Sequence, residues 1–214
     1  MKSGLRISSA EELKSLYEVL KLPQSAETCS TPLKDDIPAK MMHKLVIDPH
    51  ILPADVGGHN ASTIISVVLS TLANHQGFEE LVVASLWINA MDMVPSARWP
   101  WQLTISQWDS LADGRKWPEV RPKPLLQVNS LVFRTTVPAS CISWGSFPTV
   151  VELSFAAHDV DSLAFILSKL STIRKYNLQF KKLTLLSSHR HHPKAADVKK
   201  CKTHDVELTS KIVC

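Results

Sequence analysis

The spacing of apolar positions between residues 149 and 186 predicts a strand, a helix and a second strand. The run at 149–155 is rich in β-branched and aromatic residues, as buried strands are. The middle segment repeats apolar residues every three or four positions, which is the pattern of a helix with one buried face. That face comprises Leu163, Ile166, Leu167, Leu170 and Ile173. The run at 176–186 alternates, with Leu178, Phe180 and Leu183 pointing one way and Gln179 and Lys181 the other.

The N-terminal residues 9–20 predict a short amphipathic helix. Ser8 or Ser9 is a candidate N-cap, and Glu11 and Glu12 lie in the first turn, where carboxylates are favoured. Its apolar stripe is Leu13, Leu16, Tyr17 and Leu20. The polar stretch that follows is interrupted by prolines, which indicates a linker. Two interpretations stay open for this helix, an arm docked on the domain and a detached interaction helix, and we take Leu13, Leu16 and Tyr17 as interface candidates.

The remaining pattern predicts elements from residue 43 to residue 187. Residues 43–48 predict a strand, and residues 60–75 predict a helix with Ile64, Ile65, Val68, Leu69 and Leu72 toward a core. Residues 78–94 fit both a helix and a buried strand, and we choose the strand. We expect a short helix at 105–112, strands at 125–137 and 141–155 with Pro138 and Ala139 in the turn, and a short strand at 206–208.

Together these elements predict an α+β fold with one domain, a mostly antiparallel sheet packed with two or three helices. We assign residues 1–42 to an N-terminal helix and flexible linker, 43–187 to the core domain, and 188–214 to a basic flexible tail. Apolar content of 44% and charged content of 21% are those of a globular protein. No apolar run approaches the ~20 residues of a membrane span, and residues 1–13 lack the apolar core of a signal peptide. The chain is therefore expected in a cytosolic compartment, with its four cysteines as free thiols.

Charge is distributed unevenly along the chain. From Lys169 onward there are 11 Lys and Arg against 3 Asp and Glu, a surplus of 8, so with a net charge of +4 the preceding residues carry −4. The C-terminal quarter could therefore bind phosphate or an anionic bilayer. The candidate membrane- or phosphate-binding residues are Arg174, Lys175, Lys181, Lys182, Lys194, Lys199, Lys200 and Lys202.

Catalytic and metal-binding patterns are weak in this sequence. One cluster has ligand chemistry, His189, His191, His192, Cys201 and His204. Its irregular spacing and basic surroundings favour a solvated tail over a zinc site, so we expect no metal and no cofactor. His158 and Asp159 form the one pair resembling a catalytic dyad, but adjacent residues on a strand point apart. We expect no enzyme and no small-molecule substrate; a small hydrolase would need a deep pocket around His158.

Four tryptophans lie close together among prolines and basic residues, at positions 99, 101, 108 and 117. Any single tryptophan is most often a core residue. Four within so short a stretch, however, predict that at least one ring is exposed. Trp99 and Trp101 are therefore further interface candidates, able to lie at a lipid surface or to stack on bases.

The order of elements resembles that of the matrix proteins of rhabdoviruses and other non-segmented negative-strand RNA viruses. The resemblance covers residues 43–187 and is carried by HKLVID, STIISVVLSTLANH, EELVVASLWI and FPTVVELSFAAHDVDSLAFILSKL. It implies a structural protein of the virion that self-associates, binds the inner face of an anionic host membrane, and condenses the viral nucleocapsid or ribonucleoprotein for assembly and budding. The implied partners are a second copy, the ribonucleoprotein, an anionic bilayer and RNA. The implied locations are the virion, the host cytoplasm and the inner face of host membranes, with the nucleus as an alternative.

Two departures from that family matter. Residues 1–42 are not strongly basic, and neither P-P-x-Y nor P-[ST]-A-P occurs, so recruitment of budding machinery by those motifs is not expected. The alternative hypothesis is a nucleic-acid-binding or viral movement protein that uses the same basic quarter on RNA. Flotation with anionic liposomes beside RNA retardation separates these two hypotheses.

Overall fold

The computed structural model describes residues 3–21, 42–57, 59–73, 78–94, 99–107, 127–134, 149–156, 160–189 and 192–213. Its centre is a parallel sheet of 8 strands whose spatial order is the order of the chain. The strands are β1 (Ser3–Ile7), β2 (Met42–Ile47), β3 (Glu80–Ala84), β4 (Gln102–Gln107), β5 (Ser130–Phe133), β6 (Glu152–Ala156), β7 (Lys182–Ser187) and β8 (Glu207–Ile212). Each strand pairs in parallel with the one before it. The chain therefore advances by one strand per turn, which is the path of a solenoid.

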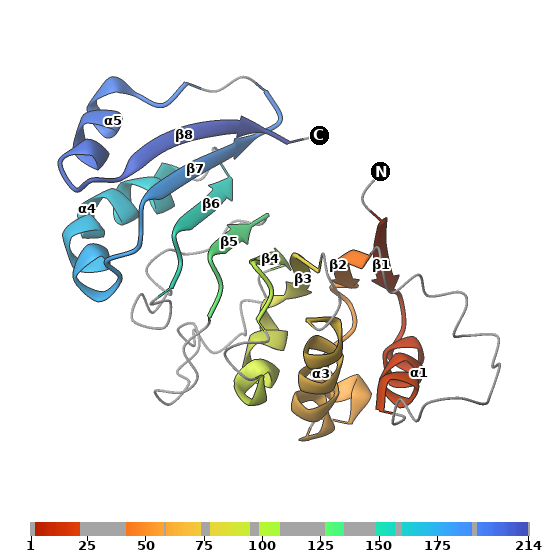
Figure 1. Ribbon diagram of the computed structural model, residues 1–214. Helices are drawn as coiled ribbons and strands as arrows, with labels where there is room; N and C mark the ends of the chain where they lie inside the picture. The colour runs from red at the N-terminus through yellow and green to blue at the C-terminus, as the bar shows by residue number, and fades with distance from the viewer. Residues whose placement is uncertain are drawn as a thin grey trace.

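The helices lie along the outer side of the curved sheet (Figure 1). They are α1 (Ala10–Lys21), η2 (Pro53–Val56), α3 (His59–Leu72), η3 (Ser85–Met93), α4 (Val160–Tyr176) and α5 (Ala195–Lys202). Neighbouring helices touch, α1 with α3, α3 with η3, and α4 with α5. Where the structure describes the connection, a coil thus consists of a strand on the inside and a helix on the outside. None of the described helices is long and apolar enough to cross a membrane.

A leucine occupies the same register position in every strand. These leucines are Leu5, Leu45, Leu81, Leu103, Leu131, Leu153, Leu183 and Leu208. All but Leu5 are buried, and Leu5 is partly buried against the same core. Because side chains alternate along a strand, the residues two positions later also point inward. Ile7, Ile47, Val83, Ile105, Phe133, Phe155 and Leu185 form this second buried row.

The turns before the strands continue the hydrogen bonding from coil to coil. The carbonyl of Trp101 accepts from Asn129 and Ser130 N–H, both at 3.0 Å. The carbonyl of Asn129 likewise accepts from the next coil, and that of Val151 accepts from Lys181 and Lys182 N–H at 2.9 and 3.0 Å. These backbone groups are therefore satisfied by stacking, as buried peptide groups require.

The antiparallel arrangement predicted from the sequence is wrong. The predicted strands at 125–137 and 141–155 are indeed neighbours, as β5 and β6, but they run parallel. The proposed turn at Pro138 and Ala139 lies outside the described residues. Strands joined by tight turns run antiparallel, whereas strands joined by a helix or a long connection can return to the same end of the sheet and pair in parallel. The strand–helix–strand unit is confirmed as β6–α4–β7 and is one coil of this kind. Its second strand begins at Lys182 and not at Tyr176, and Leu178, predicted to point the same way as Phe180, is exposed in the turn before it.

The ends of the chain are part of the sheet. The helix predicted at 9–20 is confirmed as α1, with Ser9 Oγ accepting from Glu12 N–H at 3.1 Å. It is not a detached arm, because Leu13 is fully buried and β1 pairs with β2. At the other end, the segment predicted as a basic flexible tail contains α5 and β8, which pairs along the whole of β7. The short strand predicted at 206–208 is thus confirmed and is longer than expected.

Two local predictions in the middle of the chain need correction. The helix expected from residue 105 is wrong within the described part, since Gln102–Gln107 is strand β4. Leu103 and Ile105 are both buried in the core on one side of the strand, so their spacing is that of a sheet and not of a helix face. The strand chosen for 78–94 is confirmed only for β3, after which the chain forms the 3-10 helix η3. The strand at 43–48 and the helix at 60–75 are confirmed as β2 and α3, with all five predicted α3 core residues buried.

Candidate functional site

The face of the sheet turned away from the helices is formed by the alternate residues of each strand. Next to the leucine row lies a polar row. From β2 to β7 it has four charged and two neutral members, and on β8 it ends in an acidic residue. We name it the charged row: Lys44, Glu80, Gln102, Ser130, Glu152, Lys182 and Glu207, in register from strand to strand. No described helix packs on this face (Figure 1).

In the first half of the charged row, side chains on three strands form one network. Lys44 Nζ lies 3.0 Å from a carboxylate oxygen of Glu80. Thr104 Oγ1 donates to the other oxygen of Glu80 at 2.7 Å, and Gln102 Nε2 donates to Thr104 Oγ1 at 3.1 Å. Each group is thereby held by a neighbour from an adjacent coil or its own strand. The network fixes the orientation of these side chains.

A second network repeats this arrangement at the other end of the row. Lys182 Nζ lies 3.3 Å from Glu152 Oε1, and Thr184 Oγ1 donates to the same oxygen at 2.9 Å. The hydroxyls of Thr184 and Thr209 are 3.1 Å apart. In both networks a glutamate pairs with a lysine on a neighbouring strand. The same glutamate accepts a hydrogen bond from a threonine on the following strand, two residues beyond the residue that faces it. The repetition follows from the stacking of equivalent positions in successive coils.

The electrostatics of Glu80 show how the network acts. Burial is the largest influence and raises the pKa of this carboxyl group, yet the net pKa is lowered. The hydrogen bonds from Thr104 and Lys44, with the charges of Lys44 and Arg134, outweigh the burial. Glu80 is therefore held ionised on a partly buried face, as the acceptor end of the network.

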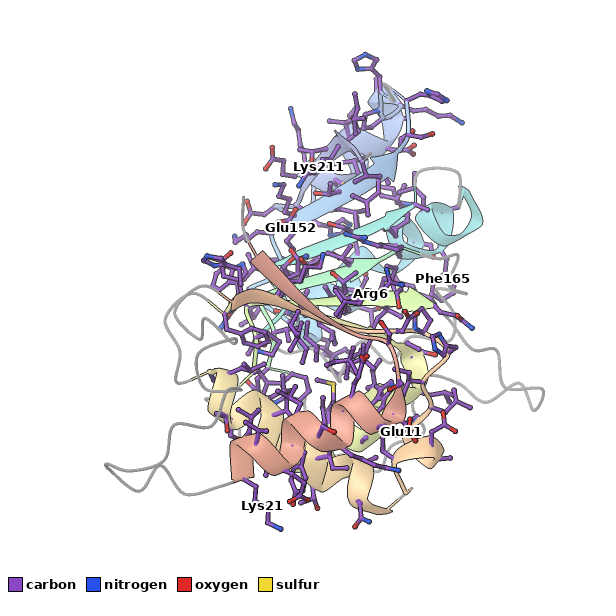
Figure 2. The ribbon with its side chains drawn as sticks, turned by 90° about the vertical axis from the view of Figure 1, so that its right-hand side faces the viewer. Arg6, Glu11, Lys21, Glu152, Phe165 and Lys211 are labelled. Carbon is purple, nitrogen blue, oxygen red and sulfur yellow. The ribbon has the colours of Figure 1, made fainter. Side chains whose placement is uncertain are left out.

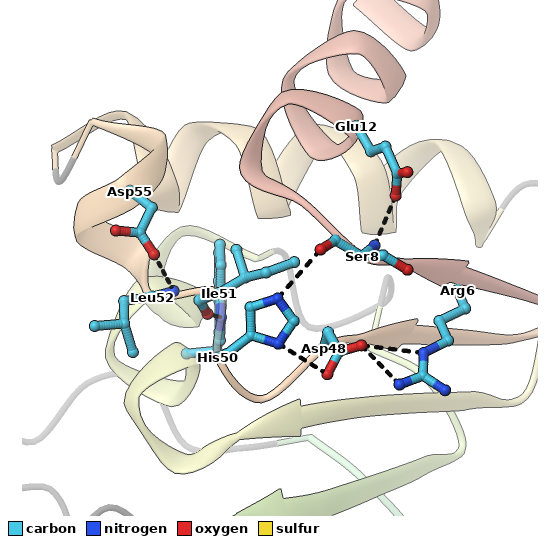
Figure 3. Close-up of polar contacts among 9 residues, drawn as sticks. Arg6, Ser8, Glu12, Asp48, His50, Ile51, Leu52 and Asp55 are labelled. Carbon is cyan, nitrogen blue, oxygen red and sulfur yellow. Dashed lines mark hydrogen bonds and ion pairs between the residues drawn. The ribbon is translucent and has the colours of Figure 1, made fainter.

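A second polar cluster joins the first two coils at the C-terminal ends of β1 and β2 (Figure 3). Arg6 donates to Asp48 Oδ2 from Nε at 3.1 Å and from Nη2 at 2.7 Å. His50 approaches Asp48 Oδ1 with Nδ1 at 3.2 Å and the Ser8 carbonyl with Nε2 at 3.2 Å. The hydrogen bond from Arg6 is the largest cause that holds the pKa of Asp48 below its ordinary value. Arg6 itself extends into solvent, with 68% of its side chain exposed.

The middle of the face is a floor of small side chains. Thr104, Ser130, Ser154 and Thr184 are buried by their neighbours, whereas the charged tips of Arg6, Lys182 and Lys211 reach solvent. The face therefore presents charges of both signs above a polar floor of small side chains. Within the described ranges, no group of three His, Cys, Asp or Glu side chains could hold a metal ion.

The predicted anion-binding residues separate into two groups. Arg174 donates to the carbonyls of Leu178 and Phe180 in the turn between α4 and β7. Lys181 pairs with Asp205, which lies in the turn between α5 and β8. Lys182 belongs to the charged row. The five others are exposed: Lys175, Lys194, Lys199, Lys200 and Lys202. Four of these five lie on α5 or directly before it.

The predicted interface residues are mostly core residues. Leu13 and Leu16 are buried, and Tyr17 and Trp99 pack against the same core. Trp99 Nε1 also donates to the Val94 carbonyl at 3.2 Å. Trp101 alone among the five interface candidates is largely exposed, at 60%. It lies in the turn before β4, where a ring is available to a partner.

The predicted ligand cluster is not assembled in the described residues. Cys201 is fully buried in α5, and burial raises the pKa of its thiol to about 11, with Asp197 adding to the effect. Its role is therefore that of a small core residue. His191 and the pair His158 and Asp159 lie outside the described residues. The expectation of no enzyme therefore stays a prediction, with a small hydrolase as the alternative.

The fold, with a polar sheet face on which no described helix packs, defines the class of this protein as an α/β solenoid with a parallel inner sheet. Comparison of the chain with protein-family models, with curated proteins and with solved structures finds no match. The class is thus defined by the geometry of the chain itself.

The sequence contains a signal for this class that the helix and strand patterns did not use. An apolar residue, two variable residues, a leucine, a variable residue and a second apolar residue recur before and within the strands. The instances are Phe78–Leu81–Val83, Val128–Leu131–Phe133, Val150–Leu153–Phe155 and Phe180–Leu183–Leu185. Such a recurring unit is what identifies a solenoid from sequence, and it would have placed the charged row on one face.

Proposed function

We propose that this chain is a non-catalytic binding scaffold, a solenoid of the leucine-rich repeat kind, which holds a protein partner on its bare sheet face. Strands that repeat L-x-x-L-x-L and lead into a helix form the inner sheet of such solenoids, and the concave sheet is an extended binding surface. The observation that carries the proposal is the charged row, with side chains from seven strands held in register.

The charge pattern of the face favours a protein over a polyanion. The charged row carries two lysines and three glutamates, with lysine beside glutamate toward each end and the neutral Gln102 and Ser130 between them. Arg6 and Asp48 form a further pair of opposite sign. A surface for nucleic acid or an anionic bilayer would present one sign over a wide area. A mixed surface selects a partner with complementary charges and disfavours partners without them.

Reversal of charges on this face tests the proposal. The face variant Lys44→Glu/Lys182→Glu leaves each glutamate opposite a like charge, so partner binding should fall about tenfold or more. The matched control Lys14→Glu/Lys169→Glu makes the same change of charge at exposed positions on α1 and α4. Partners captured by the wild type and the control, and lost by the face variant, support the proposal. Binding that survives the face variant and is lost in the control contradicts it.

A second candidate function is favoured by the lysines of α5. Lys194, Lys199, Lys200 and Lys202 are all exposed on one short helix or directly before it. Each basic residue near an anionic bilayer contributes about 1 kcal/mol, and RNA offers the same kind of phosphate surface. Membrane or nucleic-acid binding, and with it the self-association, ribonucleoprotein condensation and budding of a matrix protein, therefore stay proposals. The parallel sheet removes the fold argument for the matrix resemblance.

The second candidate is tested by two assays at matched salt. Lys199→Glu/Lys200→Glu should reduce flotation with phosphatidylserine vesicles if lipid is the partner, and RNA retardation if RNA is the partner. Lys14→Glu/Lys21→Glu on α1 is the matched control. If the wild-type protein neither floats at low salt nor retards RNA, α5 does not serve as an anion-binding surface.

A further inference from the structure

The first coil leaves an open groove at the N-terminal end of the solenoid. The groove lies between β1 and α1 and has a volume of about 510 Å³. It is lined by Leu5, Arg6, Ile7, Glu11, Glu12, Ser15, Leu16 and Val19. Figure 2 looks onto this end, with β1 and α1 nearest the viewer and no other described helix or strand in front of them. Four of its lining residues are apolar, and two are carboxylates, of which Glu12 accepts from Ser8 N–H at 2.6 Å.

The groove lies where a coil preceding the first one would pack. Within the solenoid, strands β2 to β7 are paired on both sides, and α1 contacts α3 as α4 contacts α5, but β1 is an edge strand of the sheet. The side chains of Leu5, Leu16 and Val19 that would face a preceding coil therefore face the groove. A strand beside β1 and a helix beside α1 would extend both layers in the same direction.

The opposite end of the same molecule offers such a strand and helix. β8 is the other edge strand, and it ends in exposed Ile212 and Val213, at 55% and 42% exposure. Beside it lies α5, whose last turn carries Lys199, Lys200 and Lys202. These lysines oppose in sign the two glutamates that line the groove, so the ends of the molecule are complementary in secondary structure and in charge.

We propose that a second copy of this chain docks head to tail at the groove, with its β8 beside β1 and its α5 lysines facing Glu11 and Glu12. The parallel sheet then continues from one molecule into the next. The interface is heterologous, because different surfaces of the two copies meet, so the assembly can grow at both ends. It leaves the charged row free for the partner proposed above and does not depend on that partner.

Two variants, each blocked at one end, test the proposal. Val19→Glu places a carboxylate in the groove, at a partly exposed position that tolerates the change. Lys199→Glu/Lys200→Glu reverses charge at the other end, on exposed side chains. Sedimentation velocity over a concentration series should show association of the wild type and a dissociation constant raised about tenfold or more in each variant. Lys14→Glu, an exposed change on α1 outside the groove, is the control and should associate like the wild type.

A mixture of the two blocked variants identifies the geometry. Each variant keeps one intact end, and the intact ends are different, so an equimolar mixture should form a dimer that grows no further. Circular dichroism melts establish that both variants are folded. A wild-type chain that stays monomeric throughout the series overturns the proposal. So does a mixture that fails to associate, or a lysine variant that associates as well as the wild type.

Discussion

A residue in this fold is defined by its register position, since it touches its counterparts in the coils before and after. Leu153 lies between Leu131 and Leu183, and all three are buried. Leu5 has a counterpart on one side alone within the described sheet, and it is partly exposed toward the groove. The same side chain should therefore contribute more to stability in the middle of the row than at its end.

Truncation of these leucines tests this difference. Leu153→Ala should lower the free energy of unfolding by roughly 2–5 kcal/mol, because it leaves a cavity in a packed core. Leu5→Ala should cost less, since its site is already open to solvent. Urea denaturation gives both values, with the exposed Lys211→Ala as a control near zero. Equal losses at the two leucines would show that the first coil is packed as tightly as the centre.

Asn177 is the buried polar residue that joins α4 to the preceding coil. Its Nδ2 donates to the Val150 carbonyl at 2.6 Å, and its Oδ1 accepts from Gln179 N–H at 2.9 Å. Asn177→Ala should cost about 1–3 kcal/mol, because the Val150 carbonyl loses a buried donor. Thermal melts compare it with Gln179→Ala, whose exposed side chain should matter little. A melting temperature unchanged by Asn177→Ala would mean that water replaces the amide.

At the scale of the element, local pattern predicts some features and not others. The helices α1, α3 and α4 were predictable because their apolar spacing lies within the segment itself. The sequence predicts a helix from residue 105, whereas Gln102–Gln107 is strand β4, because so short an alternation as Leu103 and Ile105 gives little periodicity. Neither the helix pattern nor the strand pattern predicts whether neighbouring strands pair in parallel or antiparallel. That direction depends on the path of the connections between the strands. The charged row depends in turn on that pairing.

Acid should weaken the link between the first two strands. The folded pKa of Asp48 is lowered below 3.8, chiefly by the hydrogen bond from Arg6, so the pair stabilises the fold above that pH. The contribution is lost as the pH falls through the lowered value. The urea midpoint of the wild type should therefore fall below about pH 4 more steeply than that of Arg6→Gln. Lys14→Gln, which leaves the pair intact, should follow the wild type. Parallel curves for wild type and Arg6→Gln would show that the pair does not contribute.

At the scale of the molecule, the solenoid explains why the ends were misjudged. The prolines of residues 23–42 predict a linker, and in most folds a linker of that kind marks the edge of a domain. In a solenoid each coil contacts only its neighbours, so a long connection between β1 and β2 interrupts neither the sheet nor the core. The tail was misjudged for a related reason, since Val206 and Leu208 find their buried places only by stacking on β7.

Removal of the first coil is the prediction that tests this organisation. A chain starting at Ala39 lacks β1 and α1, which uncovers Leu45 and Ile47 on β2 and the surface of α3 that α1 contacts. We expect it to melt well below the full chain and to bind the dye ANS, because apolar surface is exposed without a cap. Its urea m-value should also be smaller, in proportion to the surface that no longer becomes exposed on unfolding.

The matched comparison removes residues 192–214, and with them α5 and β8, at the other end. Since stability in a solenoid is close to a sum over coils and their interfaces, both truncations should leave a folded but weakened core. If the chain starting at Ala39 melts with the full chain, β1 and α1 lie outside the cooperative unit and residues 1–38 are dispensable for folding.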